Sequence, residues 1–371
     1  MKIGITGRSG FIGSHLFNNL SLFAEDFQIV DFERDAFLDE VSLDRAVRKC
    51  DIIIHLAALN RHKDPSIIYE TNIDLVSKLV SSLKRTGCTP HVILASSSQE
   101  DGETAYGRSK KIGRELIRRW AHEKKATFTG LIVPNVFGPF GKPKYNSVVA
   151  TFCSQLVNNE CPEIHNNVEL DLIYVEELIG IIISCIKKKT NCFKYRVKPT
   201  EQIRVSDLLN LLTSFKVVYQ EKGEIPVLNT PFKVALFNTY RSFLSIKNIF
   251  PRKYISHNDD RGSFVELIRL KSGGQVSFST TEPGVVRGNH FHRRKVERFS
   301  VVKGKALIQL RKVNESEIVE FYLDGNEPSY VDIPIWFTHN IRNIGEDKLY
   351  THFWINEPYD AEDSDTFFEE V

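Results

Sequence analysis

Hydrophobic residues in the first half of the chain form short continuous runs separated by longer amphipathic stretches. The runs occupy residues 2–6, 28–32, 51–56, 92–95 and 129–133. Continuous apolar runs of this length are typical of strands that are covered on both faces, and the stretches between them have the period of helices. Strands that alternate with helices predict a parallel, doubly wound α/β sheet with right-handed crossovers, of the Rossmann type.

The pattern changes after about residue 250. Short strand-like runs follow one another without intervening helices and are separated by turn signals such as Ser-Gly-Gly and Glu-Pro-Gly. The runs occupy residues 264–270, 275–280, 299–302, 306–311, 318–323, 330–333 and 350–354. Regularly spaced short strands predict an antiparallel sandwich or barrel.

Length and composition fit this division. A chain of 371 residues is long for one domain, and we place the boundary near Phe250-Pro251, with domains over residues 1–247 and 252–371.

A net charge of +2 provides no strong field for nucleic acid or an acidic membrane. Residues 178–186 are apolar but too short to span a bilayer, so they predict a buried helix. The six cysteines lack paired metal spacing, which predicts reduced thiols and a cytoplasmic location.

A glycine triplet follows the first predicted strand. Gly7, Gly10 and Gly13 stand where that strand leads into the first helix. Glycine permits a tight turn and a close approach of the backbone to a pyrophosphate, which then lies at the positive end of the helix. The triplet alone is also compatible with a plain glycine-rich turn.

A tyrosine and a lysine one helical turn apart supply candidate catalytic groups. Tyr106 and Lys110 share a helix face, and the ammonium is expected to lower the pKa of the phenol, which suits a general acid in ketone reduction. Ser96, Ser97 and Ser98 stand just upstream at a strand end. One of these hydroxyls is expected to hydrogen-bond the substrate carbonyl.

These motifs, with His55-Leu-Ala-Ala, Asn72 and Pro134-Asn-Val-Phe-Gly, resemble the extended short-chain dehydrogenase/reductase family over roughly residues 1–245. The resemblance implies that Tyr106 donates the proton, that Lys110 holds the nicotinamide ribose, and that Ser98, or as second choice Ser97, orients the carbonyl. It also implies that a nucleotide sugar binds near Asn135, Lys142 and Asn146. The residues implied to bind the dinucleotide are Gly7, Arg8, Gly10, Phe11, Ile12, Gly13, Asp31, Arg34, Leu56, Ala57, Ala58, Asn72 and Lys110.

The choice of dinucleotide rests on three charged residues. Asp31, near the end of the second strand, suits the ribose 2′-hydroxyl of NAD. Arg8 and Arg34 suit the 2′-phosphate of NADP, because a guanidinium matches phosphate geometry. Two arginines against one carboxylate favour NADPH and leave NAD as the alternative.

Three histidines and a glutamate in the second half have the spacing of metal ligands. His290 and His292 are two apart on a predicted strand and point to one side. Glu297 and His339 complete a shell of three nitrogens and one oxygen. Such a shell suits zinc, and also iron, nickel or manganese.

The spacings Gly-x5-His-x-His-x4-Glu-x6-Gly and Pro-x4-His-x3-Asn resemble the two motifs of the cupin family, a jelly-roll β-barrel. Trp336 stands where the second motif usually has glycine, and its indole is expected to narrow the mouth of the barrel. The stretch from Asp260 to Glu266 resembles the deoxysugar 3,5-epimerase branch, which implies that Arg261, Phe264 and Glu266 contact a nucleotide sugar. His290 stands at the position of that branch's catalytic histidine, which implies that it acts as a base. The presence of the full ligand set favours instead a role for His290 as a metal ligand.

The whole chain resembles fused reductase–cupin enzymes of capsule and O-antigen sugar synthesis. This resemblance implies a homodimer with zinc in the cupin. It implies C3 epimerisation of UDP-2-acetamido-2,6-dideoxy-β-L-arabino-hexos-4-ulose, then NADPH-dependent C4 reduction to a UDP-N-acetyl-L-talosamine-type sugar, a precursor of UDP-N-acetyl-L-fucosamine. The alternatives are a reductase with a non-catalytic cupin used for dimerisation, a sugar-nucleotide sensor without enzymatic activity, and a metalloenzyme acting on an unrelated small acid.

Overall fold

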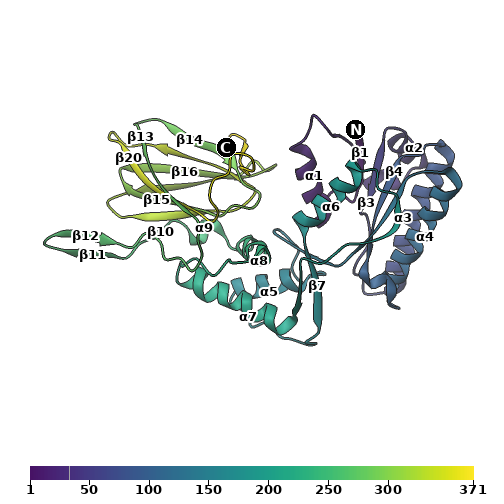
Figure 1. Cartoon of the computed structure of the whole chain (residues 1–371), viewed down its shortest axis with the longest axis horizontal. Coiled ribbons are helices and arrows are strands. Elements are labelled where there is room, and N and C mark those ends of the chain that lie inside the picture. Colours follow the sequence, from purple (N-terminus) through teal and green to yellow (C-terminus); the bar gives the residue numbers. More distant parts are fainter. Residues whose placement is uncertain (33) are drawn as a thin grey trace. The chain divides into compact units, whose positions relative to one another are not determined.

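A computed structural model describes residues 1–32 and 34–371. The backbone packs into two compact units (Figure 1). The first comprises residues 1–152 and 163–208, and the second comprises residues 153–162 and 209–371. From the sequence we predicted two domains that meet between residues 247 and 252. That boundary refers to domains that fold separately, and it stays a prediction.

The first unit is built on a six-stranded parallel sheet. Its strands, in spatial order, are β2 (Gln28–Val30), β1 (Lys2–Thr6), β3 (Ile52–His55), β4 (His91–Ser97), β5 (Phe128–Val133) and β8 (Cys192–Arg196). The five apolar runs predicted as strands are all confirmed. β1 and β3 to β5 are buried along nearly their whole length, which is why their sequences are continuously apolar.

Helices cover both faces of this sheet. Helices α1 (Phe11–Ser21) and α6 (Val175–Lys187) bury their apolar sides on one face, and α6 contains the predicted buried helix. Helices α2 (Glu40–Arg48), α3 (Pro65–Thr86) and α4 (Ala105–Lys124) cover the other. The doubly wound fold predicted from the sequence is thereby confirmed.

Shorter elements complete the first unit. They are the 3-10 helices η1 (Arg34–Phe37) and η2 (Ser98–Asp101), a small sheet of β6 (Asn135–Phe137), β7 (Glu169–Tyr174) and β9 (Glu201–Arg204), and α5 (Val148–Val157), which continues into the second unit.

The second unit contains two five-stranded sheets that enclose an apolar core. The first sheet orders β10 (Arg252–Lys253), β18 (Ser329–Ile333), β15 (Glu297–Lys303), β20 (Leu349–Ile355) and β13 (Gln275–Thr281). The second orders β17 (Ile318–Asp324), β16 (Lys305–Lys312), β19 (Phe337–Asn343), β14 (Val286–Phe291) and β21 (Phe367–Phe368). The core contains Val301, Ile308 and Val331, and this cupin-like antiparallel β architecture is as predicted.

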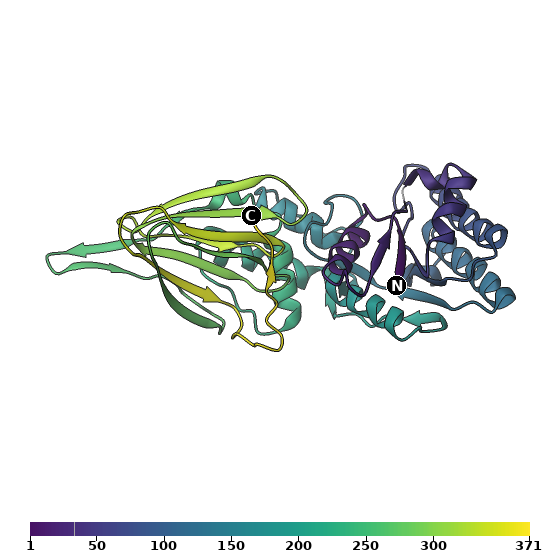
Figure 2. The same cartoon turned by 90° about the horizontal axis from the view of Figure 1, so that it is seen from above.

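Three strands of the second sheet, β14, β19 and β21, are missing from the runs predicted by the hydrophobic pattern, although the spacing of His290 and His292 predicted a strand there. β14 and β19 carry the histidines together with arginine and asparagine residues, so an apolar alternation is hard to see in their sequences. The predicted strand at 264–270 is strand only at β12 (Gly262–Val265), which pairs with β11 (Ser256–Asp259). This hairpin projects away from the two sheets of its unit (Figure 2), and Leu270 instead forms an isolated bridge with Ile225.

Helical elements join the barrel within the second unit. They are α7 (Val205–Phe215), which begins in the first unit, the π-helix η3 (Lys216–Glu221), α8 (Pro231–Arg241) and α9 (Ile246–Ile249). Arg298 pairs with Asp332 at 2.6 Å, and the Tyr219 hydroxyl donates to the same carboxylate at 2.9 Å. Arg241 donates to the Ile333 carbonyl at 2.9 Å. Since these groups are buried, the network explains why residues 209–250 pack with the barrel.

Within the described residues, the helices are all too short or too polar to cross a bilayer.

Candidate active site and metal centre

The carboxyl ends of four neighbouring strands gather the predicted reductase residues at one edge of the parallel sheet. Gly7 follows β1, Leu56 to Ala58 follow β3, Ser98 follows β4, and Asn135 comes two residues after β5. Ligands of open α/β sheets bind outside this edge. The topology therefore places the predicted dinucleotide and substrate residues on one side.

The glycine turn is shaped by close backbone contacts. Gly7 has φ +72°, and a Cβ added there would lie 2.8 Å from the Ala57 nitrogen. A Cβ at Gly13 would overlap the Gly7 carbonyl oxygen. Gly10 is the N-cap of α1, and among the described residues no side chain caps the helix there. The first amides of α1 are therefore suited to a phosphate, as expected from the sequence.

Of the charged residues expected to select the dinucleotide, Arg8 lies in this turn, whereas Asp31 and Arg34 follow β2, the strand beside β1. The Arg8 guanidinium lies 3.5 Å from the centre of the Phe17 ring, and Asp31 is exposed just after β2. Arg34 begins η1, and its side chain falls outside the described part of the structure. Phe11 and Ile12 form the first turn of α1, where Ile12 packs on the core.

Asn72 supports the loop that follows β3. Its amide exchanges hydrogen bonds with the backbone of Leu59, at 2.7 and 3.0 Å, and donates to the Ser109 hydroxyl at 3.0 Å. The buried side chain thus links this loop to α4, the helix of the catalytic pair.

Tyr106 and Lys110 lie one turn apart at the start of α4, and the lysine nitrogen is 5.8 Å from the centre of the phenol ring. The Thr104 hydroxyl caps the helix by accepting from the Gly107 nitrogen at 3.0 Å. A Cβ at Gly107 would overlap the carbonyl oxygen of Gln99. Glycine therefore lets the start of α4 approach η2, the turn formed by the serines.

The three serines upstream have different roles. Ser96 is buried and donates to Glu100 at 2.6 Å, and Glu100 pairs with Arg114 at 2.9 Å. Ser97 caps η2 by accepting from the Gln99 nitrogen at 3.2 Å, whereas Ser98 is exposed. Ser96 is thus committed to a buried network, and Ser97 and Ser98 remain the candidates for the substrate carbonyl.

The pKa of Tyr106 shifts in the direction opposite to the prediction. Burial, with a smaller contribution from Tyr145, raises the pKa of Tyr106 to about 12. Burial also lowers the pKa of Lys110 to about 8. In this structure the cost of desolvating the phenolate sets the direction of the pKa shift of Tyr106, so the expected lowering is wrong.

The predicted substrate residues of the first unit are exposed. Asn135 begins β6, and Lys142 and Asn146 lie in the following loop. Arg61 donates to the carbonyls of Lys144, at 2.8 Å, and Tyr145, at 3.1 Å, and so ties this loop to the residues after β3. Tyr145, which contributes to the raised pKa of Tyr106, stands between the predicted residues Lys142 and Asn146 in the sequence.

In the second unit, a β-bulge places two of the predicted metal ligands opposite each other on neighbouring strands. The pairing of β14 with β19 shifts between Gly288 and His290, which leaves Asn289 as the extra residue, at φ +59°. His290 then pairs directly with His339, and their rings are 4.5 Å apart. His292 follows the end of β14, and Glu297 begins β15. Ligand atoms of all four side chains lie within 4.8 Å of one another.

Hydrogen bonds to carbonyls set the tautomers of two histidines. Nδ1 of His292 donates to the Asp365 carbonyl at 2.6 Å, and Nδ1 of His339 donates to the Phe337 carbonyl at 3.1 Å. Their Nε2 lone pairs therefore face Glu297, whose Oε2 is 3.1 and 3.2 Å away. Within the described structure these three buried atoms lack hydrogen-bond partners. A divalent cation would satisfy all three, so the residues present fit a metal.

The pKa values are consistent with this interpretation. Burial, together with the neighbouring His339 and His292, lowers the pKa of His290 to about 4, so its imidazole is neutral at physiological pH. Burial acts to lower the pKa of His292, but the Glu297 carboxylate outweighs it and the net shift is upward. The carboxylate thus favours a positive charge between the side chains, either a proton or a metal ion.

The cluster opens into a cavity of about 500 Å³. Two basic residues that were missed in the sequence, Arg287 and Lys295, line it beside His290, His292 and Glu297. Lys295 is 2% exposed, and its ammonium lies 3.7 Å from Glu357. Its position between two predicted ligands was the signal that could have identified it.

The expectation for Trp336 is wrong. Its φ of +61° explains why glycine is usual at this position. The indole is 2% exposed and stacks on Phe291 at 5.5 Å, so it is absent from the described cavity lining. It packs in the interior instead of narrowing the mouth.

The three residues expected to contact the nucleotide sugar in the second unit lie outside the described cavity lining. Arg261 forms an ion pair with Asp259 at 2.6 Å, Glu266 pairs with Arg269 at 2.6 Å, and Phe264 is 68% exposed. All three lie on or beside the projecting β11–β12 hairpin.

The fold and the two sites define an extended short-chain dehydrogenase/reductase joined to a cupin. The first part is a Rossmann-type sheet with a glycine turn and a Tyr-x3-Lys helix, and the second is a barrel with a histidine cluster. The chain belongs to the NAD dependent epimerase/dehydratase family, whose model matches residues 3–197. Residues 257–367 match a polysaccharide biosynthesis C-terminal domain.

Two of the relatives cover the whole chain, and a third matches part of it. A UDP-2-acetamido-2,6-beta-L-arabino-hexul-4-ose reductase from Pseudomonas aeruginosa is 32% identical, over 99% of this chain and 98% of its own. The structure of the capsular polysaccharide assembling protein CapF from Staphylococcus aureus is 35% identical, with a TM-score of 0.65 and full coverage of both chains. The spore coat polysaccharide biosynthesis protein SpsL from Bacillus subtilis is 28% identical and matches 32% of this chain and 86% of its own length.

Proposed function

We propose that this protein is a bifunctional nucleotide-sugar enzyme of surface polysaccharide synthesis. The cupin epimerises C3 of UDP-2-acetamido-2,6-dideoxy-β-L-arabino-hexos-4-ulose, and the first unit then reduces C4 with NADPH. The product is a UDP-N-acetyl-L-talosamine-type sugar, a precursor of UDP-N-acetyl-L-fucosamine. The observation that carries the proposal is the presence of the Tyr106–Lys110 pair and the four-ligand cluster on one chain, whose full-length relative is named a 4-keto sugar reductase.

The reductase chemistry follows from the groups on α4 and η2. Bound NADPH supplies a hydride to C4. Tyr106 delivers the proton to the carbonyl oxygen, and Ser98 or Ser97 orients that oxygen by a hydrogen bond. A phenol with a pKa of about 12 keeps its proton at neutral pH, as an acid in ketone reduction requires. Lys110, on the same helix face, holds the nicotinamide ribose.

The epimerase chemistry uses the acidity beside the ketone. A carbonyl at C4 acidifies the C3 proton, and a zinc ion held by the four ligands would supply Lewis acidity toward that carbonyl. Lys295 lines the same cavity and is the candidate for moving the C3 proton. Proton return to the opposite face inverts C3, and reduction of C4 then fixes the configuration.

We further propose a homodimer in the cytoplasm. Phe264 and Ile255, in and beside the β11–β12 hairpin, are 68% and 77% exposed, and such apolar side chains favour coverage by another surface. Coverage by a second copy would let Arg261, Phe264 and Glu266 meet a nucleotide sugar in that copy's cavity. The six free cysteines suit a reducing compartment.

The test is incubation with the UDP-4-keto sugar in D2O, with and without NADPH, followed by NMR. The wild-type protein should incorporate deuterium at C3 without NADPH and give the reduced sugar with it. Absence of C3 exchange would leave a reductase with a non-catalytic cupin, and absence of both reactions would contradict the proposal.

The change Tyr106→Phe separates the two reactions. Without the phenolic proton, NADPH oxidation should fall by about 100-fold or more, whereas C3 exchange should continue because the cupin is unchanged. Loss of exchange in this variant would contradict the division of labour.

A further inference from the structure

The C-terminal segment, residues 357–371, ends in a strand that pairs with β14, the strand that carries the metal ligand His290. β21 pairs with β14, with His290 opposite Phe368 and Phe291 opposite Phe367. The rings of Phe367 and Phe291 stack at 5.4 Å. The segment just before β21 is thereby held against the turn between β14 and β15.

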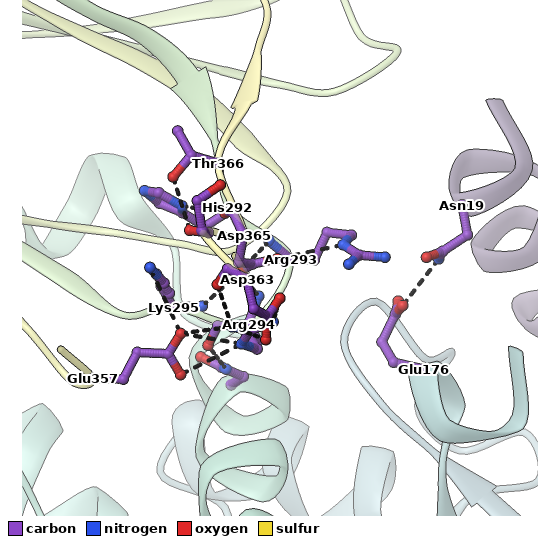
Figure 3. Close-up of polar contacts among 12 residues, drawn as sticks. Asn19, Glu176, His292, Arg293, Arg294, Lys295, Glu357, Asp363, Asp365 and Thr366 are labelled. Atoms are coloured by element: carbon purple, nitrogen blue, oxygen red, sulfur yellow. Dashed lines mark hydrogen bonds and ion pairs between the residues drawn. The ribbon is translucent and has the colours of Figure 1, made fainter. Parts of the chain in front are cut away.

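One buried carboxylate of this segment caps that turn. Asp365 is 4% exposed, and its Oδ2 accepts hydrogen bonds from the backbone nitrogens of Arg293, Arg294 and Lys295, at 3.2, 2.9 and 3.4 Å (Figure 3). Hydrogen bonds to an ionised acceptor are among the stronger ones in proteins. These three residues lie between the ligands His292 and Glu297, so Asp365 constrains the backbone that joins them.

The main chain of the same residue acts directly on a ligand. The Asp365 carbonyl accepts from Nδ1 of His292 at 2.6 Å, which leaves Nε2 of that ring as the lone-pair donor. Such outer contacts fix the tautomer and the orientation of metal-binding histidines. Asp365 therefore contributes both to the direction of one ligand and to the spacing between two.

Neighbouring residues strengthen this contact. Arg294 pairs with Asp363 at 2.8 Å and with Glu357 at 3.0 Å, and both carboxylates belong to the same C-terminal segment (Figure 3). Thr338 directly precedes the ligand His339. Its hydroxyl donates a hydrogen bond to the Glu369 carbonyl, which also belongs to the C-terminal segment. The segment thus contacts chain positions beside ligands on both strands.

We propose that Asp365 is a positioning residue of the metal centre and that the C-terminal segment thereby sets its metal affinity. This inference rests on the proposed metal-binding function of the cluster. Asp365 acts through His292 and the turn at residues 293–295, which lie some 70 positions earlier in the sequence.

The test compares Asp365→Ala and Asp365→Asn with Glu362→Ala, a change of an exposed carboxylate in the same segment. Zinc affinity is measured by competition with a chromogenic chelator, and cobalt-loaded protein is compared by its visible absorption spectrum. Asp365→Ala keeps the main-chain carbonyl that faces His292 but removes the carboxylate that holds residues 293–295. We therefore expect zinc binding to weaken by about 10-fold, the lower end of the loss typical for outer-shell partners. Asp365→Asn retains an acceptor oxygen without the charge, so its affinity and cobalt spectrum should lie between those of wild type and Asp365→Ala.

Each outcome decides the inference. Wild-type affinity and an unchanged cobalt spectrum in both Asp365 variants would overturn it while leaving the metal centre intact. Failure of the wild-type protein itself to bind zinc would overturn the metal centre as well. An equal loss in Glu362→Ala would show that the effect is not specific to Asp365. If Asp365→Ala does not fold, Asp365→Asn still provides the comparison.

Discussion

Tyr106 is half-buried, and the role proposed for it requires a proton. Its pKa is raised to about 12 by burial, with Tyr145 contributing, so the phenol is neutral at physiological pH. A neutral phenol is competent to protonate a developing alkoxide, whereas oxidation of an alcohol would need the phenolate.

Lys295 provides a prediction at the scale of one residue. Replacing it by methionine removes the ammonium while keeping most of the side-chain volume, so proton exchange at C3 should fall by about 100- to 10,000-fold. Zinc binding should persist, because Lys295 is outside the ligand cluster. Exchange is measured by NMR in D2O.

The matched control is Lys303→Met, which removes an exposed lysine at the end of β15. It should keep wild-type exchange. Normal exchange in Lys295→Met would show that another group moves the proton.

At the scale of elements, the approach of α4 to η2 depends on Gly107. An alanine there would overlap the Gln99 carbonyl oxygen, so the helix or the serine turn must shift. Misplacement of catalytic groups by about 1 Å costs on the order of 100-fold in rate. We expect kcat for NADPH-dependent reduction to fall by that order, and overpacking to lower the free energy of unfolding by about 1–3 kcal/mol.

Gly102→Ala is the control for this change. A Cβ there would lie 3.5 Å from the same Gln99 oxygen, which is an ordinary contact. Its kcat and its unfolding midpoint should remain near wild type. Equal activity of the two variants would contradict the role assigned to Gly107.

The elements also show how far periodicity carries a prediction. β1 and β3 to β5 are continuously apolar because both of their faces are buried, and they were predicted from that pattern. The hydrophobic pattern did not show β14 and β19, because their positions hold polar and ligand residues. Strands there were expected only from the histidines. The sequence also did not predict the bulge at Asn289, because a bulge is defined only by how two strands pair, here β14 and β19.

At the scale of the whole molecule, the two sites lie in separate compact units and should respond separately to metal removal. Protein stripped of metal by a chelator should lose C3 exchange, because the ligand cluster then lacks the Lewis acid. It should still oxidise NADPH with a 4-keto sugar whose C3 is already inverted. Both activities are followed in parallel by NMR and by absorbance at 340 nm.

Re-addition of zinc supplies the control, since it should restore exchange. Loss of the reduction of the pre-inverted sugar in metal-free protein would show that the metal serves the reductase as well, contrary to the proposal.

The sequence by itself determined which chemical groups are present and where local burial places strands and helices. Local patterns in the sequence predict three features. They are the glycine turn, the Tyr106–Lys110 pair, and the spacing of His290, His292 and Glu297. The tertiary structure alone decided the pKa of Tyr106, the inward packing of Trp336, and the contact of Asp365 with His292. Burial and long-range hydrogen bonds depend on residues far apart in the chain, and no local pattern records them.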